Sequence, residues 1–262
     1  MVKAQIAKLG RADIAYLDFP GTDPEKTILL IHGFASSAQV NWVGTGWVKR
    51  LTDAGYRVIA IDNRGHGKST KFYSPDDYGP DIFAADALAL LDHLGIIKCD
   101  VMGYSMGARI TCWISQQAPE RVRRAIYGGM GSRIFGGGSG SGDGGGGHEV
   151  IAAGLETDAP QTITDPTAIA FRKFADATRS DRMALAACIR PAREKITREM
   201  VSAINVPTLV AVGSTDDVGG SAEELAQMMP QGEAFVIDGL DHMKATGAES
   251  YKQAALEFLE RP

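Results

Sequence analysis

The stretch Gly103-Tyr104-Ser105-Met106-Gly107 follows a largely apolar run at residues 99–102 and precedes a helix-like segment at residues 108–114. In a Gly-x-Ser-x-Gly turn between a strand and a helix, the serine is held in a strained conformation, and the glycines avoid clashes that Cβ atoms would make. The turn predicts that the Ser105 hydroxyl projects above a sheet edge as a candidate nucleophile. Because such short motifs also recur by chance, the surrounding sequence has to supply the rest of the site.

Outside this turn, short apolar runs alternate with helical patterns along most of the chain. Residues 5–9 and 13–18 alternate apolar and polar side chains around Gly10, which is typical of a half-exposed antiparallel hairpin. Further apolar runs, which suit strands covered on both faces, lie at residues 27–31, 57–61, 99–104, 124–127, 208–212 and 233–237. Helical patterns lie at residues 47–54, 82–94, 107–117, 221–229 and 249–259. This order predicts an α/β fold with a mostly parallel sheet, an N-terminal antiparallel hairpin and helices on both faces.

Between residues 131 and 205 the alternation breaks and helical patterns dominate. Asp165 and Pro166 are typical of an N-cap and a first-turn proline that open a helix toward residue 177. Residues 181–188 and 197–204 are further helical candidates. We expect residues 132–204 to form a small helical cap over the site, inserted into a core made of residues 1–131 and 205–262.

Residues 136–147 contain only glycine, serine and one aspartate. This composition cannot bury apolar area, so it predicts a flexible segment within the cap that carries no chemistry. A native mobile loop and an engineered linker both fit the tract.

The composition describes an ordinary globular protein. The chain has 262 residues, 44% of them hydrophobic, which is enough for one large core. The formal charge is −5 and the pI is about 5.6, with the basic residues scattered, so no nucleic-acid partner is expected. No stretch reaches the roughly 18 apolar residues of a membrane span, and residues 1–10 lack the apolar segment of a signal peptide. We expect a cytoplasmic protein without a membrane partner.

The cysteines give no sign of a metal site. Cys99, Cys112 and Cys188 are widely spaced and lie in apolar segments. That placement suits buried, reduced thiols better than a disulfide framework or a zinc site.

A serine hydroxyl is a weak nucleophile at neutral pH, so it needs a base and a carboxylate that orients the base. His242 follows the last predicted strand, at the edge where loops after parallel strands converge, and is the expected base. The acid is expected after the strand at residues 208–212, where Asp216 is favoured over Asp217. Aspartates in such loops also support turns through their own backbone.

The other four histidines are not expected to act as the base. His32 and His66 are expected to shape loops, and His93 to lie on the surface of a helix. His148 follows the Gly-rich tract, where a base would be poorly positioned.

These motifs resemble those of the α/β-hydrolase-fold serine hydrolases, and of esterases among them. The resemblance covers nearly the whole chain outside the cap and the Gly-rich tract, and the motifs occur in the family's order. It implies Ser105, Asp216 and His242 as a catalytic triad, because the family's acid falls three residues after the strand-end glycine. It also implies that the backbone N–H groups of Phe34 and Met106 form an oxyanion hole. The matching segments are His32-Gly33-Phe34, Asp62-Asn63-Arg64-Gly65-His66-Gly67-Lys68-Ser69, Gly103-Tyr104-Ser105-Met106-Gly107, Gly213-Ser214-Thr215-Asp216 and Asp241-His242.

The resemblance implies a hydrolase that cleaves a small carboxylic ester through an acyl-serine, with no metal and no organic cofactor. Serine at position 105, where epoxide hydrolases and haloalkane dehalogenases of this fold use aspartate, argues against those two reactions. Lactone opening, C–C bond hydrolysis, acyl transfer and perhydrolysis use the same triad. Some proteins of this fold are ligand receptors, but the intact triad favours an enzyme.

The expected partner is a small-molecule acyl substrate with an apolar acyl or alcohol group. Phe34, Met106, Trp42 and Phe135 are the candidate substrate-binding residues. Trp47, Ile134, Phe171 and Met183 lie in neighbouring segments. Residues of these types are more often buried in a core than exposed in a pocket.

Overall fold

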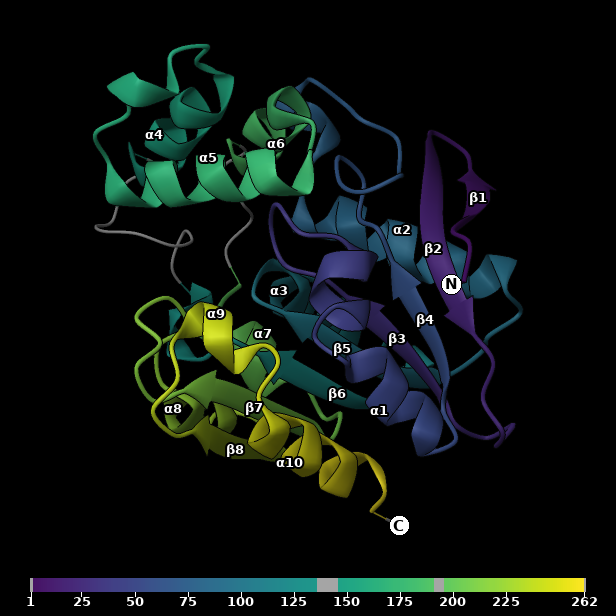
Figure 1. Ribbon diagram of the computed structural model, residues 1–262. Coiled ribbons are helices and arrows are strands. Elements are labelled where there is room, and N and C mark those ends of the chain that lie inside the picture. Colours follow the sequence, from purple (N-terminus) through teal and green to yellow (C-terminus); the bar gives the residue numbers. More distant parts are fainter. Residues whose placement is uncertain (1, 136–145, 191–195, 262) are drawn as a thin grey trace.

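The computed structural model describes residues 2–135, 146–190 and 196–261 (Figure 1). Over these residues the centre is an eight-stranded sheet in the order β1-β2-β4-β3-β5-β6-β7-β8. β5, which leads into the serine turn, lies in the interior of the sheet between β3 and β6. The strands are β1 (Gln5–Leu9), β2 (Ala12–Phe19), β3 (Thr27–Ile31), β4 (Arg57–Ile61), β5 (Cys99–Tyr104), β6 (Val122–Gly128), β7 (Thr208–Gly213) and β8 (Gly232–Ile237).

The sheet is antiparallel at its N-terminal side and parallel elsewhere. β1 pairs antiparallel with β2, and β2 with β4, whereas all neighbours from β4 to β8 are parallel. Gln5 lies opposite Tyr16 in the hairpin, and Gly10 in its turn has a φ of +68°. The carboxyl ends of the parallel strands meet at one edge, which brings their following loops together. The α/β fold predicted from the sequence is confirmed.

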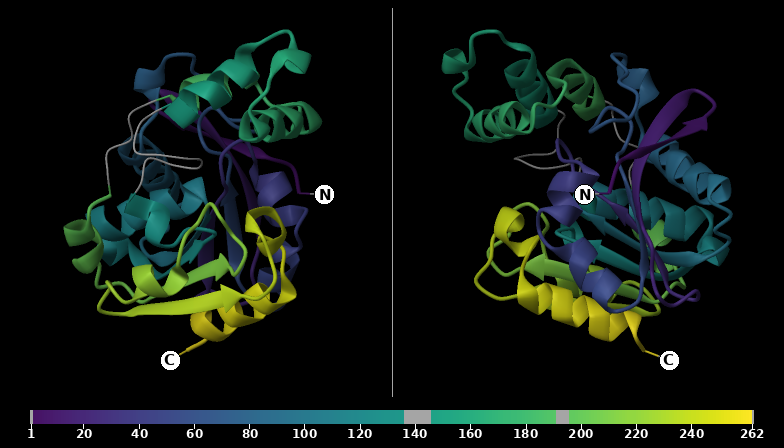
Figure 2. Two further views of the ribbon diagram at one scale, coloured as in Figure 1. Left: turned by 90° about the vertical axis from the view of Figure 1, so that its left-hand side faces the viewer. Right: turned by 45° about the vertical axis from the view of Figure 1, so that its right-hand side comes forward.

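Helices cover both faces of this sheet (Figure 2). Alternate residues of β3 point to opposite faces, as the two-residue period of a strand requires. Ile28 and Leu30 pack with α1 and α10, and Leu29 and Ile31 pack with α2, α3 and α8. The bounds of these helices are α1 (Trp47–Asp53), α2 (Pro80–His93), α3 (Met106–Gln117), α8 (Ala222–Ala226) and α10 (Glu249–Leu259).

Local signals place most helix ends near their expected positions. Ser221 Oγ accepts a hydrogen bond from the N–H of Glu224 at 3.1 Å, and this N-cap starts α8. α8 ends at Ala226, earlier than residue 229, where the sequence pattern predicted its end. Gly95 follows α2 with a φ of +67°, the conformation of a C-terminal glycine.

β8 does not fit the expectation that the parallel strands are covered on both faces. Glu233, Ala234 and Val236 are exposed, whereas every residue of the neighbouring β7 is buried. β8 is the last strand of the sheet, and an edge strand has a neighbour on one side only. The expectation is correct for β7 and wrong for β8.

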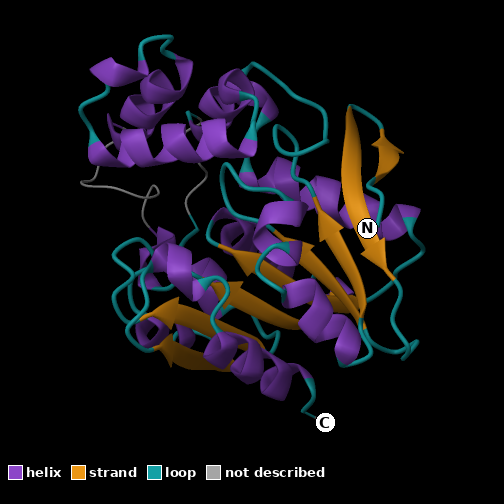
Figure 3. Ribbon diagram, viewed as in Figure 1, coloured by secondary structure: helices purple, strands orange, loops and turns teal. Residues whose placement is uncertain are grey.

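Three helices pack on one another above the carboxyl edge of the sheet (Figures 1 and 3). They are α4 (Gly146–Glu156), α5 (Pro166–Thr178) and α6 (Arg182–Ile189). Their apolar cluster includes Ile151, Leu155 and Leu185, together with Ala35 from the loop after β3. Asp165 caps α5 as predicted, since its Oδ1 accepts from the N–H of Ala168 at 2.8 Å. α4 was not predicted.

Part of the segment expected as the cap packs with the sheet instead. α7 (Arg198–Ser202) contributes Val201 to the cluster around α2 and α3, and Ile204 joins the same cluster. The proposed division of the core at residues 131 and 205 therefore remains a prediction. Gly146 and Gly147 begin α4, and residues 136–145, the rest of the Gly-rich tract, lie outside the described residues.

No helix in the described parts of the chain has the length and apolar character needed to cross a membrane.

Candidate active site

Ser105 lies at the turn from β5 into α3 and has a φ of +55°, in the left-handed region that serine rarely adopts. Only glycine fits at positions 103 and 107, on either side of this serine. A Cβ atom on Gly103 would lie 2.0 Å from the carbonyl oxygen of Gly107, and one on Gly107 would lie 2.0 Å from that of Ile31. The predicted strand–serine–helix turn is therefore present, with a strained serine at its apex.

His242 and Asp216 meet Ser105 at the carboxyl edge of the sheet. His242 Nε2 lies 3.0 Å from Ser105 Oγ, and His242 Nδ1 lies 2.8 Å from Asp216 Oδ2. A neutral imidazole has one donor and one acceptor nitrogen, and a carboxylate only accepts. Nδ1–H therefore donates to Asp216, which leaves Nε2 free to accept the Ser105 proton.

Asp216 is the aspartate of the β7 loop that faces the imidazole. Its side chain is completely buried, and its Oδ1 accepts from the N–H groups of Val218 and Gly219, both at 2.8 Å. Asp217 is exposed, and its carbonyl accepts from the Arg133 guanidinium. The structure thus brings Asp216 rather than Asp217 to His242.

His242 opens a short helix, whereas the sequence predicted a loop position. α9 (His242–Ala245) begins directly after Asp241, whose Oδ1 accepts from the N–H groups of Met243 and Lys244. The loop before it packs tightly on the strand that leads to the acid. A Cβ atom on Gly213 would lie 2.1 Å from the carbonyl oxygen of Leu240, so glycine permits this approach.

The backbone around Phe34 and Met106 lies close to Ser105. Met106 is the first residue of α3, so no carbonyl within the helix can accept from its N–H. The loop carrying Phe34 also lies against the serine, because a Cβ atom on Gly33 would be 3.4 Å from Ser105 Cβ. These placements suit the oxyanion role predicted for Phe34 and Met106, which remains a prediction.

His32 fixes the loop that carries Phe34 as a neutral imidazole. The N–H of Asn63 donates to His32 Nε2 at 3.0 Å, so the ring proton is on Nδ1, which lies 2.7 Å from the carbonyl oxygen of Gly33. Burial lowers the pKa of His32, although nearby Asp62 and the bond to Gly33 act in the opposite direction. The loop-shaping role predicted for His32 agrees with these contacts.

Asn41 is a second support of the loop that carries Phe34, and sequence reasoning missed it. Its Oδ1 accepts from the N–H of Gly33 at 3.1 Å. Asn41 belongs to a π-helical turn, Gln39–Val43, and such turns often occur at functional sites. The eight-residue separation between Asn41 and Gly33 gives no recognisable sequence signal.

Trp42 is not placed to contact a substrate. It is completely buried on the α1 and α10 face of the sheet, where its ring packs edge-on against Trp47 with centroids 6.2 Å apart. The prediction that Trp42 binds substrate is wrong, because the π-helical turn directs this side chain into the core. Met106 is likewise buried, in the cluster on the opposite face.

Phe34 and Phe135 are half-buried. Phe34 packs edge-on against Phe171 of α5, with ring centroids 5.3 Å apart. The guanidinium of Arg198 lies 5.0 Å from the centre of the Phe135 ring. Substrate contacts at Phe34 and Phe135 remain predictions.

Among the residues described, no cluster of three histidine, cysteine or acidic side chains is suited to hold a metal. Cys99, Cys112 and Cys188 are buried, and burial raises the pKa of Cys99 and of Cys112 to about 12.

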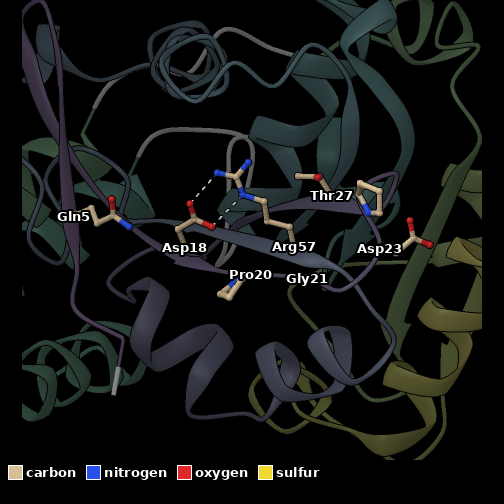
Figure 4. Close-up of a pocket in the computed structure, with 8 residues that line it drawn as sticks. Gln5, Asp18, Pro20, Gly21, Asp23, Thr27 and Arg57 are labelled. Atoms are coloured by element: carbon tan, nitrogen blue, oxygen red, sulfur yellow. Dashed lines mark hydrogen bonds and ion pairs between the residues drawn. The ribbon is translucent and has the colours of Figure 1, made fainter.

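A polar pocket of about 490 Å³ lies at the opposite end of the strands (Figure 4). Thr27 and Arg57, the first residues of β3 and β4, line it, whereas Ser105 follows the end of β5. Asp18 in this pocket accepts two hydrogen bonds from Arg57, at 2.8 and 3.1 Å. The two charges are paired, so the pocket adds nothing to the site around Ser105.

Comparison with known proteins supports the same fold. The model of the alpha/beta hydrolase fold family matches residues 26–127. The chain is 38% identical over 118 residues to a putative non-heme chloroperoxidase of Synechocystis sp., covering 44% of this chain and 39% of that protein. It is 30% identical over 172 residues to 3-oxoadipate enol-lactonase 2 of Acinetobacter baylyi, covering 62% of each. The matches thus span 39% and 62% of the lengths of these two curated relatives.

A solved structure shows the same fold over its full length. An esterase from Exiguobacterium antarcticum superposes with a TM-score of 0.79, covering 100% of both chains at 18% identity. The family match runs from the start of β3 through most of β6 and so includes the serine turn. The strand order, the strained serine and these comparisons together show that this chain has the α/β-hydrolase fold.

Proposed function

We propose that this protein hydrolyses small carboxylic esters through an acyl-serine intermediate. The observation that carries the proposal is the pair of contacts made by His242, 3.0 Å to Ser105 Oγ and 2.8 Å to Asp216 Oδ2. The first contact supplies a base for the hydroxyl, and the second orients that base.

In the first half-reaction, Ser105 Oγ attacks the ester carbonyl carbon while its proton passes to His242 Nε2. The tetrahedral intermediate then breaks its bond to the alcohol oxygen, which takes the proton from the imidazolium. The acyl group stays on Ser105. Asp216 stabilises the imidazolium, since its buried carboxylate is held by two backbone N–H groups and by His242 Nδ1.

The negative charge that develops on the carbonyl oxygen needs fixed donors. The N–H groups of Phe34 and Met106 are assigned this role because donors held by the backbone need no reorganisation during the reaction. Loss of one oxyanion donor typically costs about 2.7–4 kcal/mol of barrier. The ties from His32 and Asn41 to Gly33 hold the Phe34 peptide in place.

In the second half-reaction, water replaces the alcohol. His242 Nε2 takes a proton from the water as it attacks the acyl carbon, and then returns this proton to Ser105 Oγ. The carboxylic acid leaves, and the serine is restored. In both half-reactions His242 first takes a proton from the attacking group and then gives it to the leaving group, so a single histidine serves both as base and as acid.

The surroundings favour an apolar acyl or alcohol group. The side chain of Phe34 contacts Phe171 of α5, and Ala35 belongs to the apolar cluster of α4, α5 and α6. The loop with the oxyanion donor thus presents apolar groups to the helices above it. Transfer of apolar substrate surface to such a site is favourable by about 25 cal/mol per Å².

The test combines a covalent probe with an ester series. A fluorophosphonate should label the wild-type protein and fail to label Ser105→Ala. p-Nitrophenyl esters of increasing acyl length should be hydrolysed by the wild type alone. An unlabelled wild-type protein would support a ligand receptor, and labelling without turnover would exclude simple esters as substrates.

Lactone hydrolysis is a second candidate, favoured by the 30% identical relative named 3-oxoadipate enol-lactonase 2. A lactone is an internal ester, so the same two half-reactions apply and the alcohol remains attached to the acyl group. Including five- and six-membered lactones in the substrate series distinguishes the two candidates. Product analysis with added alcohol or peroxide detects acyl transfer or perhydrolysis, in which another acceptor replaces water.

A further inference from the structure

Tyr104, the residue before the serine, links the serine turn to the backbone of the histidine. It is the last residue of β5 and is 3% exposed. Its hydroxyl donates to the carbonyl oxygen of His242 at 2.5 Å, across 138 residues of sequence. The two rings also face each other at a tilt, with centroids 5.5 Å apart.

The end of β6 is shaped to admit the Tyr104 ring. A Cβ atom on Gly128 or on Gly129 would lie 2.7 Å from atoms of this ring. Gly129 also has a φ of +61°, which a larger residue adopts only with strain. With glycine at both positions, the Tyr104 side chain can extend from the end of β5 to His242.

The Tyr104 hydroxyl remains a donor over the working pH range. Burial raises the pKa of Tyr104, so the phenol keeps its proton. Thr246 Oγ1 also approaches the His242 carbonyl, but at 3.4 Å, which makes a weaker bond. Tyr104 is thus the stronger of these two side-chain donors to that carbonyl.

His242 needs such an anchor because its neighbours face solvent. Met243 is 65% exposed, and Lys244 and Gly239 are also exposed. Asp216 and Ser105 engage the two nitrogens of the ring, but neither holds the backbone of His242. The rest of α9 is held by buried Ala245 and by the Trp47 indole, which donates to the carbonyl of Thr246 at 2.7 Å. The Tyr104 bond adds a tie at the His242 peptide itself, and its loss lets this peptide shift and carry Nε2 away from Ser105.

We infer that Tyr104 is a positioning residue that holds the backbone of His242 so that Nε2 stays within hydrogen-bond reach of Ser105. The inference rests on the proposed acyl-serine function for its effect on rate. The arrangement couples base and nucleophile directly, because the residue that bonds the base is adjacent in sequence to the nucleophile. Displacement of the base slows proton transfer and leaves substrate binding largely unchanged.

The experiment compares Tyr104→Phe with Tyr251→Phe. Each variant loses one buried hydroxyl, that of Tyr251 near Gly128 and that of Tyr104 near Gly129, but the Tyr251 hydroxyl has no hydrogen-bond partner among the described residues. Tyr104→Phe should react with a fluorophosphonate about 3- to 12-fold more slowly, the rate equivalent of one buried hydrogen bond. It should lower kcat on an active ester with little change in KM. Tyr251→Phe should stay within about twofold of wild type, and Thr246→Val should show a smaller loss than Tyr104→Phe.

A second measurement does not depend on turnover. The His242 Nδ1 proton, bonded to buried Asp216, can be followed by proton NMR through its exchange with solvent. Tyr104→Phe should speed this exchange at least about threefold while Tyr251→Phe leaves it unchanged. Unchanged exchange in Tyr104→Phe, or an equal increase in Tyr251→Phe, overturns the inference. The wild type could also fail to react with the fluorophosphonate, which would reject the proposed function. If exchange is then still faster in Tyr104→Phe alone, the positioning role is supported.

Discussion

Gly107 lies directly against the carbonyl of Ile31, so the serine turn of β5 is packed onto the neighbouring strand β3. A Cβ atom at Gly107 would be 2.0 Å from that carbonyl oxygen and 2.7 Å from its carbon. Ile31 cannot move aside, because it is completely buried and pairs with Gly103 and Ile61 in the sheet. The close approach sets the height of Ser105 above the sheet.

Gly107→Ala is therefore expected to destabilise the fold by about 3 kcal/mol or more, at the upper end of what overpacking costs. Gly95→Ala is the matched control, since Gly95 has a φ of +67° but no atom within 4 Å of the position that a Cβ would occupy. Gly95→Ala should lower the free energy of unfolding by about 1 kcal/mol, from backbone strain alone. Urea unfolding measures both values, and an equal loss in the two variants would contradict the packing argument.

The parts of the fold that sequence predicted well are those whose local pattern agrees with their environment. The apolar run at residues 27–31 coincides with β3, which is enclosed between two helical layers. The serine turn was also predictable, because its glycines are needed to avoid steric clashes, and the five-residue motif is visible in the local sequence. His242 was predictable from its place after the last strand.

Features set by tertiary packing were not predictable. α4 begins with two glycines and contains a third, Gly154, so its local helix propensity is low. Its stability comes from packing against α5 and α6, and a Cβ atom on Gly154 would lie 3.1 Å from Ala168 Cβ. The burial of Trp42 and the exposure of β8 likewise depend on neighbours that are distant in sequence.

The two neighbouring aspartates are expected to differ sharply in function. Asp216→Asn removes the carboxylate that orients His242, and a comparable change in a serine protease lowers kcat by about 10⁴-fold. Asp217→Asn is the control, since that side chain is exposed and the residue contacts Arg133 through its backbone carbonyl, which the substitution keeps. It should change kcat less than about twofold. Steady-state kinetics on the best ester measures kcat for both variants. An equal loss of kcat in the two variants would contradict the role proposed for Asp216.

Phe34→Ala tests whether the oxyanion donor is a backbone group. The substitution keeps the N–H but removes the ring that packs on Phe171, so we expect kcat/KM to fall about 10-fold, equivalent to about 1.4 kcal/mol. The kcat/KM of Ser105→Ala should fall by at least about 10³-fold, because it removes the proposed nucleophile. Phe171→Ala, which removes the other ring of the pair, serves as the control for lost packing. A Phe34→Ala variant as inactive as Ser105→Ala would contradict the assignment of the donor.

His32 makes the stability of the protein depend on pH. Burial is the main cause that lowers its pKa in the folded state, below the value of about 6.5 expected in the unfolded chain. When the pH falls below about 6.5, the unfolded chain binds a proton that the folded protein does not, so stability decreases on acidification. The contribution of one such group is at most about 1.4 kcal/mol per pH unit.

The contribution of His32 can be isolated by replacing it with a residue that does not titrate. His32→Asn is expected to be less stable than wild type at pH 7, because it disturbs the bonds to Asn63 and Gly33. Its deficit should shrink between pH 7 and pH 5, because only the wild type still has a buried imidazole that resists protonation. Urea unfolding at several pH values measures this deficit, with His93→Asn at an exposed position of α2 as the control. Parallel stability curves for wild type and His32→Asn would show that His32 does not cause the acid sensitivity.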